Sequence, residues 1–270
     1  MMYGLLKRLD DAAFLGFRIW EFSFRSLRRR YALTFLHHIV LRHPANAIAG
    51  VSKYRRLVRA NLEQSDITML FEDSEDDLVS RLATARKDLL VAVGFCQKPI
   101  DPPCPAGRPN HDCVFLEELD LKGAAESVHE ACRQCNIRTI GLQALRAGAN
   151  MHIMTSALDI ARDVMIPSTK HQRFSDAVMC LCPYSVQAIQ LPLLICGMEG
   201  FLVGYSSGNC SDYEQWLRAD RGIKKEITTL SASAYEKVMT LLDRLAAQRE
   251  KEGVRYTRFS RRGNIYVPRQ

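Results

Sequence analysis

Cysteine is the residue type with the richest chemistry in this sequence. The chain has 270 residues, and nine of them are cysteine, an odd number. Its first residues contain no apolar block followed by a small-residue cleavage site, so we expect no secretory signal and no complete disulfide framework. In a reducing cytoplasm, this many thiols favours metal, iron–sulfur or redox chemistry over the simple burial of small apolar side chains.

Seven of these cysteines follow predicted strands or lie in the loops and helix starts beyond them: Cys96, Cys104, Cys113, Cys132, Cys135, Cys182 and Cys210. The carboxyl ends of parallel strands share one edge of a sheet, where ligands bind, so we expect these thiols to gather there. Cys180 and Cys196 are predicted core residues, since one lies inside an apolar run and the other late in a predicted helix. Cys180 shares a strand face with Cys182 and stays a reserve ligand.

The number of candidate thiols favours an iron–sulfur site. A cluster usually needs four cysteine thiolates, so the set suffices for one [4Fe–4S] cluster with spare thiols, or for two clusters, one having a non-cysteine or open position. The C-x-x-C pair Cys132/Cys135 begins a predicted helix, whose free amides and dipole stabilise thiolates. Structural zinc, the alternative, takes four ligands and leaves the other thiols unexplained, and a dithiol–disulfide pair is the third interpretation.

Two groups of other polar residues also suggest chemistry. His111 and Asp112 adjoin Cys113, where they form either a proton relay or metal ligand or, as we favour, a solvated turn. A predicted strand is followed by Thr155, Ser156 and Asp159. We expect Ser156 to cap the next helix, the alternative being that this helix start binds an anionic group of a substrate.

Apolar runs alternate with helical patterns from residue 78 onward, which is typical of an α/β fold. We therefore predict a mainly parallel sheet with flanking helices, Rossmann-like in type, and an exposed tail in which residues 265–267 are available as an edge strand. The predicted strands are 89–95, 151–155, 176–181 and 201–205, and the predicted helices are 132–148, 158–166 (ended by Pro167), 184–196 and 233–252.

The order of the cysteines and their neighbours also follows a known pattern. It comprises a strand running into Cys96, Cys104-Pro105-Ala106, Cys132-x-x-Cys135, Asp176-Ala177-Val178 leading to Cys182, and Gly208-x-Cys210. On these residues, the segment 89–216 resembles the cysteine-rich domain of unknown function found in many archaea and anaerobic bacteria. The resemblance implies a metal or iron–sulfur protein without an assigned reaction. The sequence departs from the pattern at His111-Asp112-Cys113 and in the loop 167–174.

Charge divides the chain unevenly. Residues 1–60 contain 12 Lys and Arg against 3 Asp and Glu, whereas the remainder contains 25 against 27. Within 11–31, apolar and aromatic residues recur at helical spacing on one face and arginines on another, which is typical of a helix in the membrane interface or one packed on a partner. We predict a basic helical extension (1–70), a cysteine-rich α/β domain (78–253) and a basic tail (254–270).

These features predict a cytoplasmic iron–sulfur protein with a redox role, in electron transfer or as an oxidoreductase. Residues 1–60 would attach it to the anionic inner face of a membrane or to a membrane or redox protein, and no nucleic-acid partner is expected. The alternatives are a zinc-stabilised, non-catalytic binding module and a sulfur-handling enzyme with a non-redox cluster. No apolar run is long enough for an orthodox spanning helix, and no nucleotide-binding or H-E-x-x-H motif is present.

Overall fold

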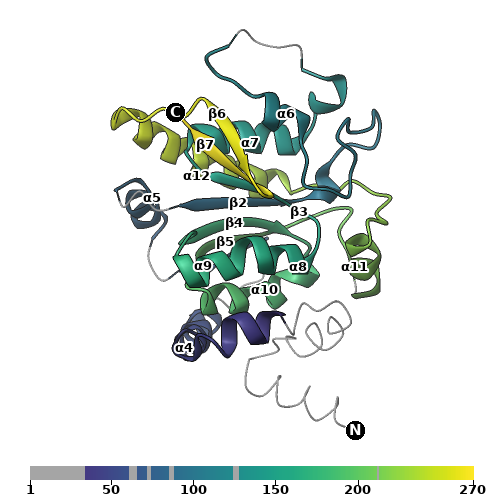
Figure 1. The fold of residues 1–270 in the computed structure, drawn as a ribbon. Helices are drawn as coiled ribbons and strands as arrows, with labels where there is room; N and C mark the ends of the chain where they lie inside the picture. The colour runs from purple at the N-terminus through teal and green to yellow at the C-terminus, as the bar shows by residue number, and fades with distance from the viewer. Residues whose placement is uncertain (1–33, 61–65, 72–73, 85–87, 124–127, 212) are drawn as a thin grey trace.

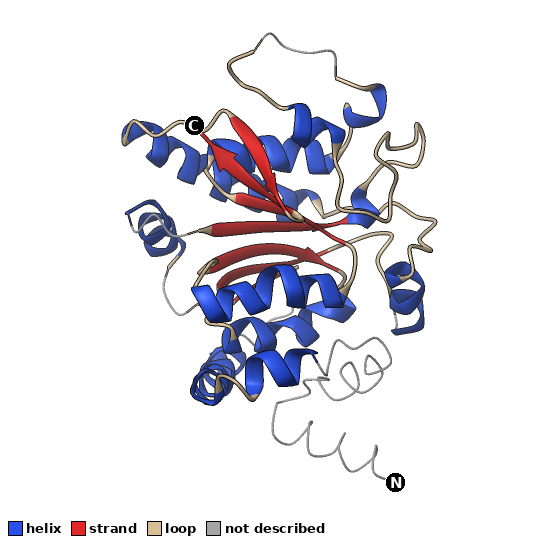
Figure 2. Ribbon diagram, in the orientation of Figure 1, coloured by secondary structure: helices blue, strands red, loops and turns tan. Residues whose placement is uncertain are grey.

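A seven-stranded mixed sheet with helices on both faces forms the centre of the protein (Figures 1 and 2). The computed structural model describes residues 34–60, 66–71, 74–84, 88–123, 128–211 and 213–270. The predicted α/β class with flanking helices is confirmed for this part of the chain, but the sheet is mixed and is parallel only in its centre. The predicted amphipathic helix at 11–31 lies outside the described residues.

The strand order is β1-β5-β4-β2-β3-β7-β6. Strands β5, β4, β2 and β3 are parallel, and both outer parts of the sheet pair antiparallel to them. The central strands are almost continuously apolar because helices cover both of their faces. The bounds are β1 (Ile67–Met69), β2 (Leu89–Gly94), β3 (Asn150–Met154), β4 (Asp176–Leu181), β5 (Glu199–Gly204), β6 (Arg258–Arg262) and β7 (Ile265–Arg269).

The helices form two layers, each closing its own apolar core against the sheet (Figure 1). On one face lie α5 (Glu75–Thr84), α6 (Val114–Glu118), α7 (Asn136–Arg146) and α12 (Ala232–Lys251). On the other lie the π-helix η2 (Leu36–Val40), α4 (Pro44–Ala60), α8 (Ala157–Asp159), the π-helix η5 (Ile160–Met165), α9 (Ile166–His171) and α10 (Pro183–Ile195). Short 3-10 turns η3 (Phe95–Gln97) and η4 (Glu130–Cys132), with α11 (Tyr213–Asp220), complete the elements.

The connections place a crevice between β2 and β4. The chain crosses from β2 to β3 through α7 on one face of the sheet, but from β3 to β4 and from β4 to β5 through helices on the opposite face. The loops that leave the neighbouring strands β2 and β4 therefore diverge, and such a switch point is where open parallel sheets bind ligands. Cys96 follows β2, and Cys182 follows β4.

Two local predictions were wrong. Pro167 does not end its helix, which continues to His171, and the turn directly before the proline is the π-helix η5, the kind of local irregularity found where the regular helical hydrogen bonding is interrupted. The C-terminal segment is not an exposed tail: β6 and β7 form a hairpin, and β7 pairs with β3 inside the sheet. Ile265 and Tyr266 are buried there, and Gly263, at φ +63°, makes the turn between the strands.

The described part of the basic N-terminal segment packs on the body of the protein. Helix α4 lies against α10 and buries Tyr54 and Leu57 in the core. Gly50 permits this approach, since a Cβ there would lie 2.6 Å from the Cα of Ile195. No helix among the described residues is long and apolar enough to span a membrane. The predicted division into extension, domain and tail stays a prediction.

Candidate functional site

Three of the predicted ligands, which we call the strand-end cysteines, lie together at the carboxyl edge of the sheet. Cys96 lies in η3 just after β2, Cys182 precedes the first residue of α10, and Cys210 lies in the loop after β5. All three line a cavity of about 100 Å³, together with Trp216 and Lys224. The sheet edge predicted from the sequence is therefore where these thiols meet.

The strand-end cysteines differ in the direction in which their surroundings shift their pKa values. The Cys210 thiol hydrogen-bonds to the Cys182 sulfur and thereby lowers the pKa of Cys182, while the same bond raises the pKa of Cys210. The backbone N–H of Cys210 also donates to the Cys182 sulfur at 3.3 Å, and the Lys224 ammonium lies 3.8 Å from the Cys210 sulfur. Burial raises the pKa of Cys96, against a 2.9 Å hydrogen bond from the Thr228 hydroxyl. Cys182 is therefore the thiol of this group whose deprotonation its surroundings favour.

The remaining four predicted ligands, which we call the loop cysteines, are Cys104, Cys113, Cys132 and Cys135. Burial raises the pKa of Cys113 to about 12, and the nearby thiols of Cys135, Cys132 and Cys104 add to the rise. Burial also raises the pKa values of Cys132 and Cys135, and each of these thiols likewise interacts electrostatically with its neighbours in the group. Backbone N–H groups at the start of α7 oppose the rise at Cys135, as expected at a helix N-terminus.

A buried lysine organises the loop that carries the first two loop cysteines. Lys98 is only 1% exposed, and its ammonium donates to the carbonyls of Gly107 (2.9 Å) and Asn110 (3.1 Å) and to the Asn110 side chain. The Asn110 amide in turn donates to the Ala106 carbonyl. Burial lowers the pKa of Lys98, and the nearby Cys104 thiol is the first of several acidic groups that oppose this. Lys98 thus offers a positive charge to thiolates in this group.

Arg108 connects the two cysteine groups. Its guanidinium donates to the carbonyls of Lys224 (2.6 Å), Glu226 (2.8 Å) and Cys96 (3.2 Å). The loop that carries Cys104 is therefore bound to η3, which ends β2, and to the loop that carries Lys224. The structure arranges the seven predicted ligands as two adjacent groups.

The spacing of the cysteine sulfurs bears on whether they could bind a single metal ion. Among the described residues, no three cysteine sulfurs lie within 4.8 Å of one another, as ligands of one ion would. The loop cysteines are nonetheless near enough to shift one another's pKa values. The thiols of this group are therefore neighbours without forming the compact set that a single ion needs.

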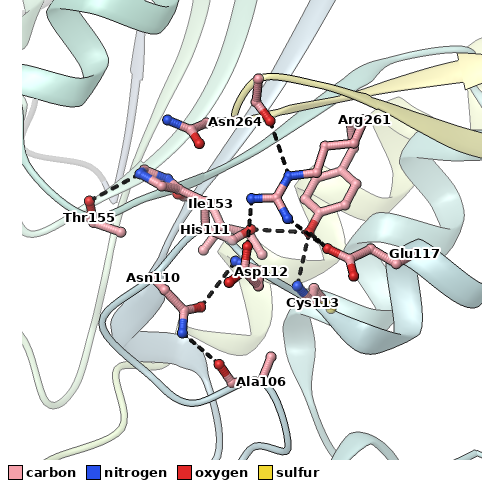
Figure 3. A network of polar contacts seen from close by, with 12 residues as sticks. Ala106, Asn110, His111, Asp112, Cys113, Glu117, Ile153, Thr155, Arg261 and Asn264 are labelled. Atoms are coloured by element: carbon pink, nitrogen blue, oxygen red, sulfur yellow. Dashed lines mark hydrogen bonds and ion pairs between the residues drawn. The ribbon is translucent and has the colours of Figure 1, made fainter.

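The other predicted residues have structural partners. Cys180 and Cys196 are 0% and 4% exposed, as expected of core residues, although Cys180 also reaches the cavity. The predicted cap at Ser156 is confirmed, since its hydroxyl accepts from the Asp159 N–H at 3.2 Å. Asp112 pairs with Arg261, and Figure 3 shows both within a polar network around His111 and Cys113.

The sequence pattern did not identify several residues of these sites. They are Lys98, Arg108, Lys224, Thr228 and Tyr266. Lys98 and Arg108 lie in the Pro- and Gly-rich loop, where no periodicity indicates which side chains turn inward. Tyr266 belongs to the predicted tail with an available edge strand at 265–267, although the turn residues Gly263-Asn264 before that apolar run are consistent with a hairpin. Comparison with known proteins finds no matching protein-family profile, curated protein or solved structure.

Proposed function

We propose that this chain is an iron–sulfur protein with a redox role, in which the loop cysteines hold a [4Fe–4S] cluster. The observation that carries the proposal is the electrostatic interaction among Cys104, Cys113, Cys132 and Cys135, which come from one loop, the turn η4 and the start of α7. Four thiolates are the usual ligand set of such a cluster, which would supply one-electron transfer. The chain's own contribution is to bury these thiols and to place the Lys98 charge beside them.

The strand-end cysteines support a second part of the proposal. Three thiols beside a cavity match a second cluster that lacks one cysteine ligand and so leaves an iron open to a small molecule. Their position at the switch point between β2 and β4 supports the Rossmann-like, doubly wound interpretation of the fold, in which that crevice is the ligand site. The resemblance of residues 89–216 to a cysteine-rich family of expected metal proteins points in the same direction.

The test is anaerobic purification of the full chain, followed by an absorption spectrum and by analysis of iron, zinc and acid-labile sulfide. We expect a coloured protein with iron and sulfide in near-equal amounts. A colourless protein with stoichiometric zinc and no sulfide would favour the zinc-binding module and overturn the proposal. A coloured protein that no reductant or oxidant changes would favour the sulfur-handling enzyme with a non-redox cluster.

We further propose that the N-terminal segment attaches the protein to an anionic membrane surface. Leu41 and Ile48 are 72% and 73% exposed, and Ile48 lies on the same groove of α4 as Arg55 and Arg56. Apolar side chains beside arginines suit the headgroup region of a bilayer, where each basic residue contributes about 1 kcal/mol. We expect the full chain to sediment with vesicles containing phosphatidylserine, less so at high salt. Equal sedimentation with neutral vesicles would favour a protein partner.

A further inference from the structure

A second kind of metal-ligating cluster lies beside the cysteines and contains none of them. One donor atom each of His111, His152 and Asp159 lies within 4.8 Å of the other two, the only such group among the described residues. The residues come from three segments: the loop before Cys113, strand β3, and the end of α8. Their convergence depends on the tertiary structure, since no two of them share a sequence motif.

Backbone carbonyls fix the orientation of both imidazoles. Nδ1 of His111 lies 2.7 Å from the Ile153 carbonyl, and Nδ1 of His152 lies 3.0 Å from the Asn264 carbonyl. A carbonyl only accepts, so each Nδ1 carries the proton, and each Nε2 presents a lone pair. Most metal-binding histidines are oriented in this way by an acceptor behind the ring. The rings stack with centroids 5.4 Å apart, and Figure 3 shows His111 beside Thr155.

Asp159 completes the group. Its Oδ2 accepts from the Thr155 N–H (2.7 Å) and from the Thr155 hydroxyl (2.8 Å), which holds the carboxylate in place. The same oxygen lies 3.6 Å from Nε2 of His111. Its Oδ1 is buried and has no hydrogen-bond donor among the described residues.

The Nε2 atoms of the two histidines and the carboxylate of Asp159 attract a cation because they are acceptors that face one another with no donor hydrogen between them. His152 is 0% exposed, and its Nε2 also finds no donor in the described part of the chain. Burial lowers the pKa of His152, against the influence of Asp159, and so favours the neutral form that binds metals. The Thr155 hydroxyl donates to Asp159 and is therefore not available as a donor to His111. Buried acceptors without donors are costly unless a cation satisfies them.

We infer that His111, His152 and Asp159 bind one divalent transition-metal ion of the zinc type. Two imidazoles and a carboxylate are a recurrent ligand set for such ions, and three protein ligands leave a fourth position for water. The ion would fasten the loop that carries Cys113 to strand β3 and to α8. The inference does not depend on the cluster proposed for the loop cysteines, because the two ligand sets share no residue.

Cobalt(II) added to the metal-stripped full chain distinguishes the two ligand sets. Binding by nitrogen and oxygen gives weak ligand-field bands, whereas cysteine binding adds an intense thiolate-to-cobalt charge-transfer band. In the wild type we expect weak ligand-field bands from a cobalt ion bound by nitrogen and oxygen, lost in His111→Gln and Asp159→Asn but kept in the control His171→Gln, which replaces an exposed histidine. Any thiolate band from cobalt on the cysteines should persist in all three variants. Thr155→Val should weaken zinc binding by about 10–100-fold, as expected for removal of a residue that orients a ligand.

A second measurement needs no variant. Zinc alone should protect His111 of the wild type from acylation by diethyl pyrocarbonate, while His171 stays reactive. Equal modification of His111 with and without zinc, or a cobalt species that persists unchanged in both ligand variants, would overturn the inference. Failure of the cluster proposal would instead leave these results intact and appear as the absence of iron and sulfide from the protein as purified.

Discussion

The two cysteine groups are held by different parts of the fold. Two of the strand-end cysteines, Cys96 and Cys182, directly follow the paired strands β2 and β4, so the hydrogen-bond register of the parallel sheet sets where their backbones begin to diverge, while Cys210 lies in the loop after β5. Of the loop cysteines, Cys104 and Cys113 lie on irregular chain that the buried Lys98 and the half-buried Arg108 hold, whereas Cys132 and Cys135 lie in η4 and at the start of α7. Strand ends thus position thiols through backbone pairing, whereas the loop depends on a few charged side chains. Replacing those side chains should affect the loop group first.

The largest expected effect comes from removing one cysteine of each group. Cys135→Ala should abolish the iron and sulfide held by the loop cysteines, because a cluster rarely survives the loss of a thiolate ligand. Cys182→Ala should leave the iron and sulfide of the loop cysteines intact. The control Cys196→Ala, at a core cysteine, should keep the full iron and sulfide content. Iron and sulfide analysis after anaerobic purification is the measurement. If Cys135→Ala and Cys182→Ala each lose everything, the two groups form one site and the comparison fails.

Lys98→Met should give the next largest effect. It removes a buried donor from two carbonyls and an amide oxygen, so we expect the free energy of unfolding to fall by about 3 kcal/mol. The control Lys237→Met removes a partly exposed ion pair with Glu75 and should cost less than about 1 kcal/mol. Urea titration compares the two. A similar loss in both variants would show that Lys98 does not hold the loop.

Arg108→Lys tests the connection between the groups. A lysine keeps the charge but loses the planar fork that reaches three carbonyls, so we expect a loss of about 1–2 kcal/mol. Amide hydrogen exchange should accelerate at Thr228, whose N–H donates to the Cys96 carbonyl. The exposed pair of Arg255 and Glu250 supplies the matched control, Arg255→Lys. Unchanged exchange at Thr228 would mean that the two groups are mechanically independent.

The smallest effect concerns pH. Cys182 has a lowered pKa because the Cys210 thiol hydrogen-bonds to it, and only the thiolate reacts with iodoacetamide. In metal-free protein, alkylation of Cys182 should therefore rise with pH earlier than for an ordinary thiol. Cys210→Ala should move this rise to higher pH, while Cys210→Ser, which keeps an O–H donor, should move it less. Identical profiles for all three proteins would remove the assigned role of Cys210.

The sequence predicted the parts of the site that regular structure positions. Strand β4 matches its predicted range, and each end of α10 lies within one residue of the predicted end. Both predictions succeed because an apolar run and the residues that start a helix are signals carried by the segment itself. Cys96 and Cys182 were therefore placed correctly at the sheet edge. The separation into two groups was not predictable, since it depends on how Lys98 and Arg108 fold the loop. His152 was missed because an apolar strand context gives no sign that its ring meets His111.

The position of Tyr266 has a consequence for biosynthesis. Its hydroxyl accepts from the Cys113 N–H at 2.9 Å and donates to the His111 carbonyl at 3.1 Å, so β7 holds the end of the loop that carries Cys113. On the ribosome, residues 104–135 emerge long before β7, and domains fold progressively as they are made. The loop cysteines therefore leave the ribosome without their final support. Metal delivered before residue 266 is synthesised would reach a loop without the Tyr266 contacts. Metal delivered afterwards would reach a loop that Tyr266 already holds.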